Sequence, residues 1–307
     1  MRKLLLIDAN SVIHRSFHAL PPFTAPDGSP TGAVYGVASI LLKLWREDRP
    51  DYAAALFDRP EPTFRDKKYA EYKAQRPAAP DILVSQIIEM HNLFRAFGIA
   101  TFEKPGFEAD DLIATLAMRF KNENDIKVVI LTGDRDTLQL VEDEKIVVQT
   151  FNKGVSDTTI YDEKAVMEKY GLPPKAIVDY KALAGDSSDN IKGVPGIGPK
   201  TATELLKKFG SIENIYENLE SDPKIEKKFA PFRKEAELSK ELVTLEKNVP
   251  LGDIELSALA PEYDEPAIVA YFDKKGFATL VKRLNGSEKN NKPAKGDRPK
   301  SVQGRMF

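Results

Sequence analysis

Acidic side chains gather in the stretch from Gly106 to Asp136, and each lies where a predicted element begins or ends. The apolar spacing of the run LIATLAM predicts a helix, so the Glu-Ala-Asp-Asp before it forms the first turn. The run from Val128 to Leu131 predicts a buried parallel strand, and Thr-Gly-Asp-Arg-Asp leaves its carboxyl end. Open α/β sheets form their sites at that edge. The candidate residues here are Glu108, Asp110, Asp111, Asp134 and Asp136.

Acids also follow two earlier predicted strands. Leu4 to Ile7 is followed by Asp8, and Ala53 to Phe57 is followed by Asp58. A simpler interpretation remains open, in which Asp8 caps the next helix and the acids before LIATLAM complement a helix dipole, at about a few tenths of a kcal/mol each. With two acids of the later GDSSDN motif the set has nine members: Asp8, Asp58, Glu108, Asp110, Asp111, Asp134, Asp136, Asp186 and Asp189.

Nine carboxylates at one sheet edge favour bound cations, because like charges in a protected cleft raise each other's pKa. The chain has no Cys and only three His, so hard oxygen ligands would select Mg²⁺, or Mn²⁺ in its place. Two such ions about 4 Å apart suit in-line displacement at phosphorus. The acids therefore predict hydrolysis of a phosphodiester.

Composition limits the remaining classes of protein. The 307 residues are 42% hydrophobic and 30% charged, as in ordinary globular proteins. No apolar run approaches the roughly 20 residues of a membrane span, and the N-terminus turns polar too soon for a signal peptide. We expect a cytoplasmic, nucleoid-associated monomer that does not contact a membrane. The formal net charge of −2 hides a basic surface, because 45 basic residues would face only 38 acids if the nine bind metal.

Residues 59–80 combine cations and aromatic rings between prolines. Cations that follow phosphates and rings that stack on bases suit single-stranded nucleic acid. The alternative is a solvated surface helix whose tyrosines cover the core. Helical spacing would place on one face Arg65, Tyr69, Tyr72, Lys73 and Arg76.

A glycine-rich turn follows GDSSDN. Its glycine order does not match a dinucleotide fingerprint, and it lies between two predicted helices. Glycines let backbone N–H groups approach a phosphate, and the helix that follows presents its N-terminus, so the turn suits a phosphate backbone without reading sequence. A plain helical hairpin with glycine caps is the alternative. The residues concerned are Gly193, Gly196, Gly198, Lys200 and Thr201.

The elements together predict an α/β fold with a central, mostly parallel sheet flanked by helices. Further expected elements are helices at 31–45 and 81–97, a strand at 99–102, and a hairpin of 146–151 with 158–161. After Pro173 and Pro174 no strand pattern appears. We expect a catalytic core at 1–172, a helical DNA-binding subdomain at 173–285 with its hairpin at 188–209, and a disordered basic tail at 286–307.

Six motifs in this order resemble the 5′ nucleases of the flap-endonuclease superfamily, especially the 5′→3′ exonuclease domain of bacterial DNA polymerase I and its stand-alone relatives. They are LLLIDANS, PTGAVYGV, LFDRPEPTFRDKKYAEYKAQRP, GFEADDLIATLA, TGDRD and GDSSDNIKGVPGIGPKTA. The similarity covers about residues 3 to 285. It implies a PIN/resolvase-like core, a helical arch at about 59–80 through which a 5′ single strand passes, and a helix-hairpin-helix that binds duplex DNA.

The resemblance also implies roles for single residues. Lys73 and Arg76 match contacts to the scissile phosphate, Tyr72 matches a base-stacking position and Arg65 a phosphate contact. Gly193 to Thr201 matches the duplex-binding hairpin, which often holds a K⁺ ion. A first metal would take Asp8, Asp58, Glu108, Asp110 and Asp134, and a second would take Asp111, Asp136, Asp186 and Asp189.

The end of the chain carries one further hypothesis. A polymerase I chain would continue for hundreds of residues, whereas this one stops after a short basic tail, so we expect a free-standing nuclease. Its last residues fit the Gln-x-x-Leu/Met-Phe pattern of peptides that dock on the bacterial sliding clamp, through Gln303, Met306 and Phe307. A chance match, or a truncation within a linker, is the alternative.

We therefore expect a Mg²⁺-dependent nuclease that removes 5′ flaps and RNA primers from nicked or gapped duplex in replication and repair. Two other functions remain open. One is a PIN-type ribonuclease, a class that is usually shorter and lacks both arch and hairpin. The other is a non-catalytic protein that binds DNA junctions.

Overall fold

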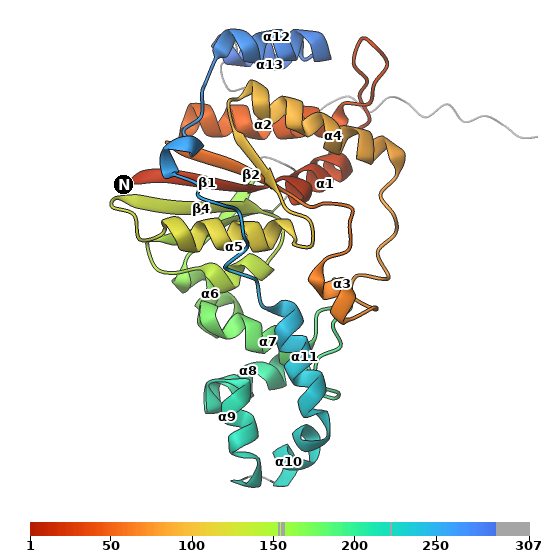
Figure 1. Ribbon diagram of the computed structural model, residues 1–307, viewed down its shortest axis with the longest axis vertical. Coiled ribbons are helices and arrows are strands. Elements are labelled where there is room, and N and C mark those ends of the chain that lie inside the picture. Colours follow the sequence, from red (N-terminus) through yellow and green to blue (C-terminus); the bar gives the residue numbers. More distant parts are fainter. Residues whose placement is uncertain (153, 155–156, 222, 287–307) are drawn as a thin grey trace, which may run out of the picture.

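The computed structural model describes residues 1–286 except 153, 155, 156 and 222. Its centre is a six-stranded sheet in the order β3-β2-β1-β4-β5-β6, parallel except for the hairpin of β5 with β6 (Figure 1). The strands are β1 (Arg2–Asp8), β2 (Tyr52–Phe57), β3 (Ala100–Glu103), β4 (Ile126–Thr132), β5 (Ile146–Phe151) and β6 (Thr158–Tyr161). The expected α/β fold, its buried strands and its terminal hairpin are confirmed.

Both faces of the sheet are covered, because alternate residues of each strand point to opposite sides. Leu5 and Ile7 of β1 join a core beneath α1 (Ala9–Ala19), α2 (Gly32–Glu47) and α4 (Asp81–Ala96). Leu4 and Leu6 join a second core beneath α5 (Ala109–Phe120). Burial on both faces explains why the strands read as continuous apolar runs.

A helical part extends away from the sheet (Figure 1) and has its own apolar core. α6 (Glu163–Tyr170), whose Val166 is buried in the core beneath α5, leads into this part. Its helices are α7 (Ile177–Ala184), α8 (Pro199–Phe209), α9 (Ile212–Glu217), α10 (Pro223–Phe229) and α11 (Arg233–Val243). Short 3₁₀ turns lie between them at Pro174–Ala176, Leu219–Ser221 and Ala230–Phe232. No strand occurs among the described residues beyond 161, as expected. The glycine-rich turn connects α7 to α8, which confirms a hairpin between two helices.

The last helices differ from the expected single helical unit at 173–285. After a 3₁₀ turn at Leu256–Leu259, α12 (Glu265–Lys275) and α13 (Ala278–Leu284) return to the sheet domain. Ile268, Phe272 and Leu280 are buried there in the same core as α2 and α4. Their apolar groups therefore complete the N-terminal core, a partnership that helical periodicity alone does not reveal.

The segment 59–80 also differs from expectation. Its helix α3 covers only Phe64–Lys68, and turns follow, so the predicted helical face through Arg76 does not form. Lys73 has a positive φ of 51°, which is incompatible with a continuing right-handed helix. The turns direct Tyr72 into a small apolar cluster with Ile191 and Leu242.

Some expectations fall outside the described residues. These include all but Gly286 of the tail, and with it Gln303, Met306 and Phe307. Over the residues that the structure does describe, none of the helices combines the length and the apolar character that crossing a bilayer requires.

Candidate active site

Three adjacent parallel strands bring acids to one edge of the sheet. β1 lies between β2 and β4, so the carboxyl ends of all three lie side by side. Asp8 ends β1, Asp58 follows β2, and Asp134 follows β4. The N-terminus of α5 joins this edge, because the backbone N–H of Ala109 donates to Asp58 Oδ1 at 2.7 Å.

Short polar bonds fix the acids of β1 and β4 against each other. Asp8 caps α1 by accepting the Ser11 N–H at 2.9 Å, and its other oxygen accepts the Thr132 hydroxyl at 2.6 Å. The Asp134 N–H donates to the same hydroxyl at 2.9 Å. Asp134 Oδ1 in turn accepts the Asp136 N–H at 2.9 Å. Asp8 therefore caps α1 and also lies among the other acids, two roles that the sequence analysis treated as alternatives.

The electrostatics of this edge are those of crowded carboxylates. Burial, followed by the charge of Asp58, raises the pKa of Asp8 to about 7, with Asp134 adding to the rise. Burial raises the pKa of Asp110 well above its ordinary value, with Asp134, Asp8 and Asp58 as further causes. These four acids form no ion pair within the described part of the chain. We call Asp8, Asp58, Asp110 and Asp134 the acidic quartet.

The acidic quartet fits a divalent cation by its chemistry. All its donors are carboxylate oxygens, the ligands that Mg²⁺ and Mn²⁺ prefer. Asp110 Oδ1 is buried and has no hydrogen-bond partner, a costly state that a cation would relieve. Within residues 1–286, apart from the four omitted positions, no group of three or more Asp, Glu or His side chains is already converged as a metal site. The fold thus brings the four acids to one edge of the sheet, but their oxygens do not yet converge on a common metal position.

The other five acids already have cationic partners. Lys73 Nζ lies 2.5 Å from Glu108 Oε1, and Arg76 donates to Asp189 Oδ1 at 2.7 Å. Lys181 pairs with Asp136 and, at 2.7 Å, with Asp186. The charge of Lys181 keeps the pKa of Asp186 below its ordinary value although burial opposes this.

Arg65 and Asp111 form a buried bidentate pair, with guanidinium to carboxylate distances of 2.7 and 2.8 Å. Asp111 is fully buried and also accepts the N–H groups of Glu108 and Glu246. In this structure the oxygens of Asp111 are occupied by these partners, so its expected role as a metal ligand stays a prediction. The side chain of Arg65 is only 1% exposed, so this structure does not present it for the expected phosphate contact.

Tyr72 is only 4% exposed, so this structure does not present its ring for the expected stacking on a base. Its hydroxyl lies 3.0 Å from both Glu108 Oε2 and Asp189 Oδ2, to which it can donate. Burial, with these two carboxylates, raises the pKa of the Tyr72 hydroxyl. Tyr69 is half-buried and donates to Glu71 at 3.1 Å. Tyr72 is therefore a bridge between two acids.

Lys73 and Arg76 do reach the acids from the 59–80 segment. Burial opposes the charge of Lys73, but Glu108 and Asp189 outweigh it and raise the pKa of this ammonium. Arg76 remains half exposed and also donates to the Ser188 carbonyl at 3.2 Å. Two cations therefore stand beside Glu108 and Asp189, and the charge of Lys73 also acts on Asp110 of the acidic quartet.

The glycines of the turn between α7 and α8 have different physical reasons. At Gly193 a Cβ would come within 2.4 Å of the Gly185 nitrogen, so packing requires glycine. Gly196 has a φ of 79° with open space beside it. Gly198 has an ordinary φ of −95° and open space, and it precedes the exposed Lys200 at the start of α8. Thr201 is half-buried one position further on.

Sequence reasoning missed several polar residues that organise the site. Lys181 links Asp136 to Asp186, and Thr132 links Asp8 to Asp134. The position of Thr132 at the end of an apolar strand was a usable signal. Nothing in the spacing of Lys181 predicted its two partners, because one of them lies 45 residues earlier.

Two family models cover most of the chain. Residues 3–171 match the N-terminal resolvase-like domain of 5′-3′ exonucleases, and residues 172–265 match their C-terminal SAM fold. The chain belongs to the 5′-3′ exonuclease family. The expected 5′ nuclease resemblance is thereby confirmed.

Individual relatives agree with the family. The 5′-3′ exonuclease of Aquifex aeolicus is 43% identical over 258 residues, which are 84% of this chain and 85% of that protein. The DNA polymerase I of Caldicellulosiruptor bescii is 41% identical over 93% of this chain, but this chain spans only 34% of that protein.

Two solved structures share the fold. Bacteriophage T5 5′-exonuclease, with zinc bound, has a TM-score of 0.63 and 22% identity, covering 93% of this chain and 99% of its own. The catalytic core of Rad2 in complex with DNA substrate has a TM-score of 0.56 and 18% identity, covering 92% of each chain.

Proposed function

We propose that this member of the 5′-3′ exonuclease family is a Mg²⁺-dependent exonuclease and 5′ flap endonuclease. It would remove flaps and RNA primers from nicked or gapped duplex DNA. The observation that carries the proposal is the acidic quartet, gathered at one sheet edge beside the cations Lys73 and Arg76. Related structures contain zinc or DNA, which supports a divalent ion and a DNA substrate.

The acidic quartet would hold a first divalent ion. A second ion could be bound by Glu108, Asp136, Asp186 and Asp189 once the Lys and Arg side chains that pair with these acids move away. When bound, divalent ions of this kind lower the pKa of water to near neutrality and offset negative charge on phosphate oxygens. Asp111, which is paired with Arg65, would join a second ion only if that pair opened.

Lys73 and Arg76 would exchange carboxylate partners for the scissile phosphate. Their backbones are held in place, since the Lys73 N–H donates to the Asp189 carbonyl at 3.0 Å and the Arg76 N–H donates to the Lys73 carbonyl at 2.9 Å. Their charges would stabilise the extra negative charge that develops on the phosphate oxygens during hydrolysis. The segment itself would form the arch beside which the 5′ strand passes.

The turn between α7 and α8 would hold the duplex. Open space beside Gly196 and Gly198 lets a phosphate approach the N-terminus of α8, while Lys200 and Thr201 add a cation and a hydroxyl. A K⁺ ion between backbone carbonyls and a phosphate would suit this turn. Such contacts read no sequence, so binding should weaken steeply with salt.

The deciding experiment incubates a 5′-labelled flap duplex with the protein, with and without Mg²⁺, and maps the product lengths. We expect Mg²⁺-dependent products of the flap, and loss of cleavage with retained DNA binding in Asp134→Ala. Asp273→Ala, an exposed acid on α12, is the matched control. Preferential cleavage of plain RNA would favour a PIN-type ribonuclease, and binding without any cleavage would favour a junction-binding protein.

The terminal peptide supports a second proposal, that Gln303, Met306 and Phe307 dock on the bacterial sliding clamp. Its support is the match of QGRMF to the clamp-binding pattern alone. A pull-down with purified clamp compares the full chain with a variant lacking residues 303–307. Equal capture of both proteins would end this proposal.

A further inference from the structure

The chain leaves the helical part through residues 242–249, the end of α11 and the irregular segment after it, which we call the exit strap. Side chains of the sheet domain hold its backbone. Arg65 donates from Nε to the Leu242 carbonyl at 2.8 Å and from a terminal nitrogen to the Thr244 carbonyl at 2.9 Å. These two contacts join α3 to the end of α11, across more than 170 residues of sequence.

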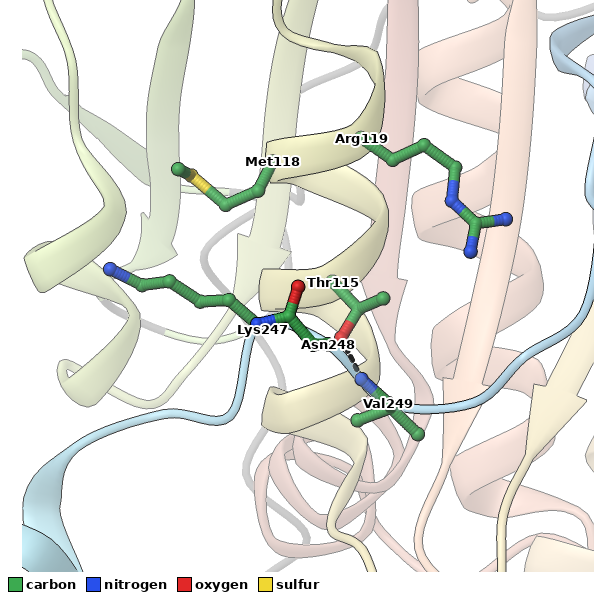
Figure 2. Close-up of a pocket in the computed structure, with 6 residues that line it drawn as sticks. All are labelled: Thr115, Met118, Arg119, Lys247, Asn248 and Val249. Atoms are coloured by element: carbon green, nitrogen blue, oxygen red, sulfur yellow. Dashed lines mark hydrogen bonds between the residues drawn. The ribbon is translucent and has the colours of Figure 1, made fainter.

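Three more side chains continue this ladder of bonds. Gln139 donates to the Val243 carbonyl at 3.1 Å and accepts the Leu245 N–H at 3.1 Å. Asp111 accepts the Glu246 N–H at 2.9 Å. Thr115 on α5 accepts the Val249 N–H at 3.0 Å, the bond drawn in Figure 2. Backbone groups of residues 242–246 and of Val249 are therefore bonded to the sheet domain, largely to elements that carry the acids.

Arg65 is the centre of this arrangement. Its guanidinium uses all five N–H groups: two on exit-strap carbonyls, two on Asp111 and one on Glu108 at 3.2 Å. The side chain is 1% exposed, so each acceptor that it abandoned would be left without water as a substitute. The planar guanidinium of arginine has five N–H donors and can satisfy all of these acceptors, whereas the ammonium of lysine has only three donors.

The helical part is tied to an acid-bearing element at each end. At its entry, Lys181 of α7 pairs with Asp136, which follows β4. At its exit, Arg65 ties the exit strap to Asp111, which lies on the same first turn of α5 as Asp110. The position of α5, and with it the acidic quartet, is thus mechanically linked to the position of the helical part.

We propose that Arg65 is a positioning residue that sets the register between the duplex-binding helical part and the carboxylates of the sheet domain. The inference rests on the proposed function. The α7 to α8 turn holds the duplex, and Arg65 fixes the distance from that grip to the acids, so it determines which phosphodiester is cut. It acts through Asp111 and Glu108 and does not touch the substrate.

The test compares Arg65→Lys with the wild type in single-turnover cleavage of a labelled flap duplex. The substitution keeps the charge and removes the fork. We expect the cleavage rate to fall about 10- to 100-fold, as for loss of a partner that orients catalytic ligands. We also expect the products to spread over neighbouring positions, while the affinity for uncut duplex stays within about twofold.

Arg46→Lys is the matched control, because Arg46 also donates to a backbone carbonyl, that of Arg283, far from the acids. Asp111→Asn provides a second route to the same effect, since it leaves Arg65 in place and weakens its bidentate partner. Circular dichroism and thermal unfolding establish the folded fraction of every variant, and all rates are compared per folded molecule.

Unchanged product lengths in Arg65→Lys, with a rate that follows only the folded fraction, would overturn the proposal. Failure of both Arg65→Lys and Asp111→Asn to fold would also overturn it, because the contacts would then serve stability rather than register. If the wild type itself cuts no flap, the proposed function fails instead, so the two failures are distinguishable.

Discussion

The Lys73 ammonium lies 2.5 Å from Glu108 Oε1, at the sheet edge where the acids gather. The pair brings together the 59–80 segment and the residue that precedes the first turn of α5. Asp189 Oδ2 lies 3.8 Å from the same nitrogen, so this cation stands between two carboxylates. Lys73 is therefore poised at the site before any substrate arrives, and movement of its partners would free it for a phosphate.

Replacement of Lys73 should impair chemistry more than binding. In Lys73→Ala we expect single-turnover cleavage of a flap duplex to fall about 10²- to 10³-fold, the range for removal of one group that stabilises transition-state charge. The dissociation constant should change only a few-fold. Lys68→Ala removes an exposed ion pair with Glu241 and is the control. A cleavage rate within about twofold of the wild type would contradict a catalytic role for Lys73.

Removal of one charge from the acidic quartet should stabilise the metal-free protein. Asp110 is crowded by three acids and has a buried oxygen without a partner. We expect Asp110→Asn to raise the unfolding free energy by about 0.5–2 kcal/mol in EDTA, because it removes one of the charges that repel each other at this site. The same substitution should abolish cleavage. Asp189→Asn should do the opposite, because Asp189 is paired with Arg76. Denaturant unfolding of both variants decides, and equal destabilisation would refute the crowding argument.

The quartet also predicts a pH dependence that Mg²⁺ removes. Because the folded-state pKa of Asp8 is raised to about 7, its protonated form is favoured in the folded protein. Its contribution to stability is present below about pH 4 and is lost as the pH rises toward 7, at about 1.4 kcal/mol per pKa unit. In EDTA, the advantage of Asp8→Asn over the wild type should therefore grow from pH 4 to pH 8. Saturating Mg²⁺ should reverse that advantage at pH 8. A constant difference across this range would exclude the assignment.

Local pattern predicted the sheet because each strand is a short apolar run that is buried on both faces. It also placed Asp8, Asp58 and Asp134 correctly, since the carboxyl ends of adjacent parallel strands share an edge. These two results need only local composition and one rule of topology.

The features that the sequence did not predict depend on contacts between residues far apart in the chain. Arg65 and Tyr72 are of the residue types that contact nucleic acid when they are exposed. Both are buried here by α11 and the exit strap, which lie about 170 residues later in the sequence. Asp111 and Asp110 are the same residue type at neighbouring positions. Only the bond from the Arg65 guanidinium distinguishes Asp111 as a residue that holds the structure together. The return of α12 and α13 to the first core has the same origin, because their apolar faces do not specify which surface they cover.

Gly193 and Gly198 should respond in opposite ways to the same added methyl group. Gly193→Ala would place a Cβ within 2.4 Å of the Gly185 nitrogen at a φ of 65°, so we expect strong destabilisation of the helical part. Gly198 has an ordinary φ and open space, so Gly198→Ala should leave the melting temperature within about 2 °C. Duplex affinity should nevertheless fall about tenfold, because the methyl group occupies the approach to the N-terminus of α8. Thermal unfolding and fluorescence anisotropy measure both effects, and full duplex affinity in Gly198→Ala would exclude this turn as the phosphate grip.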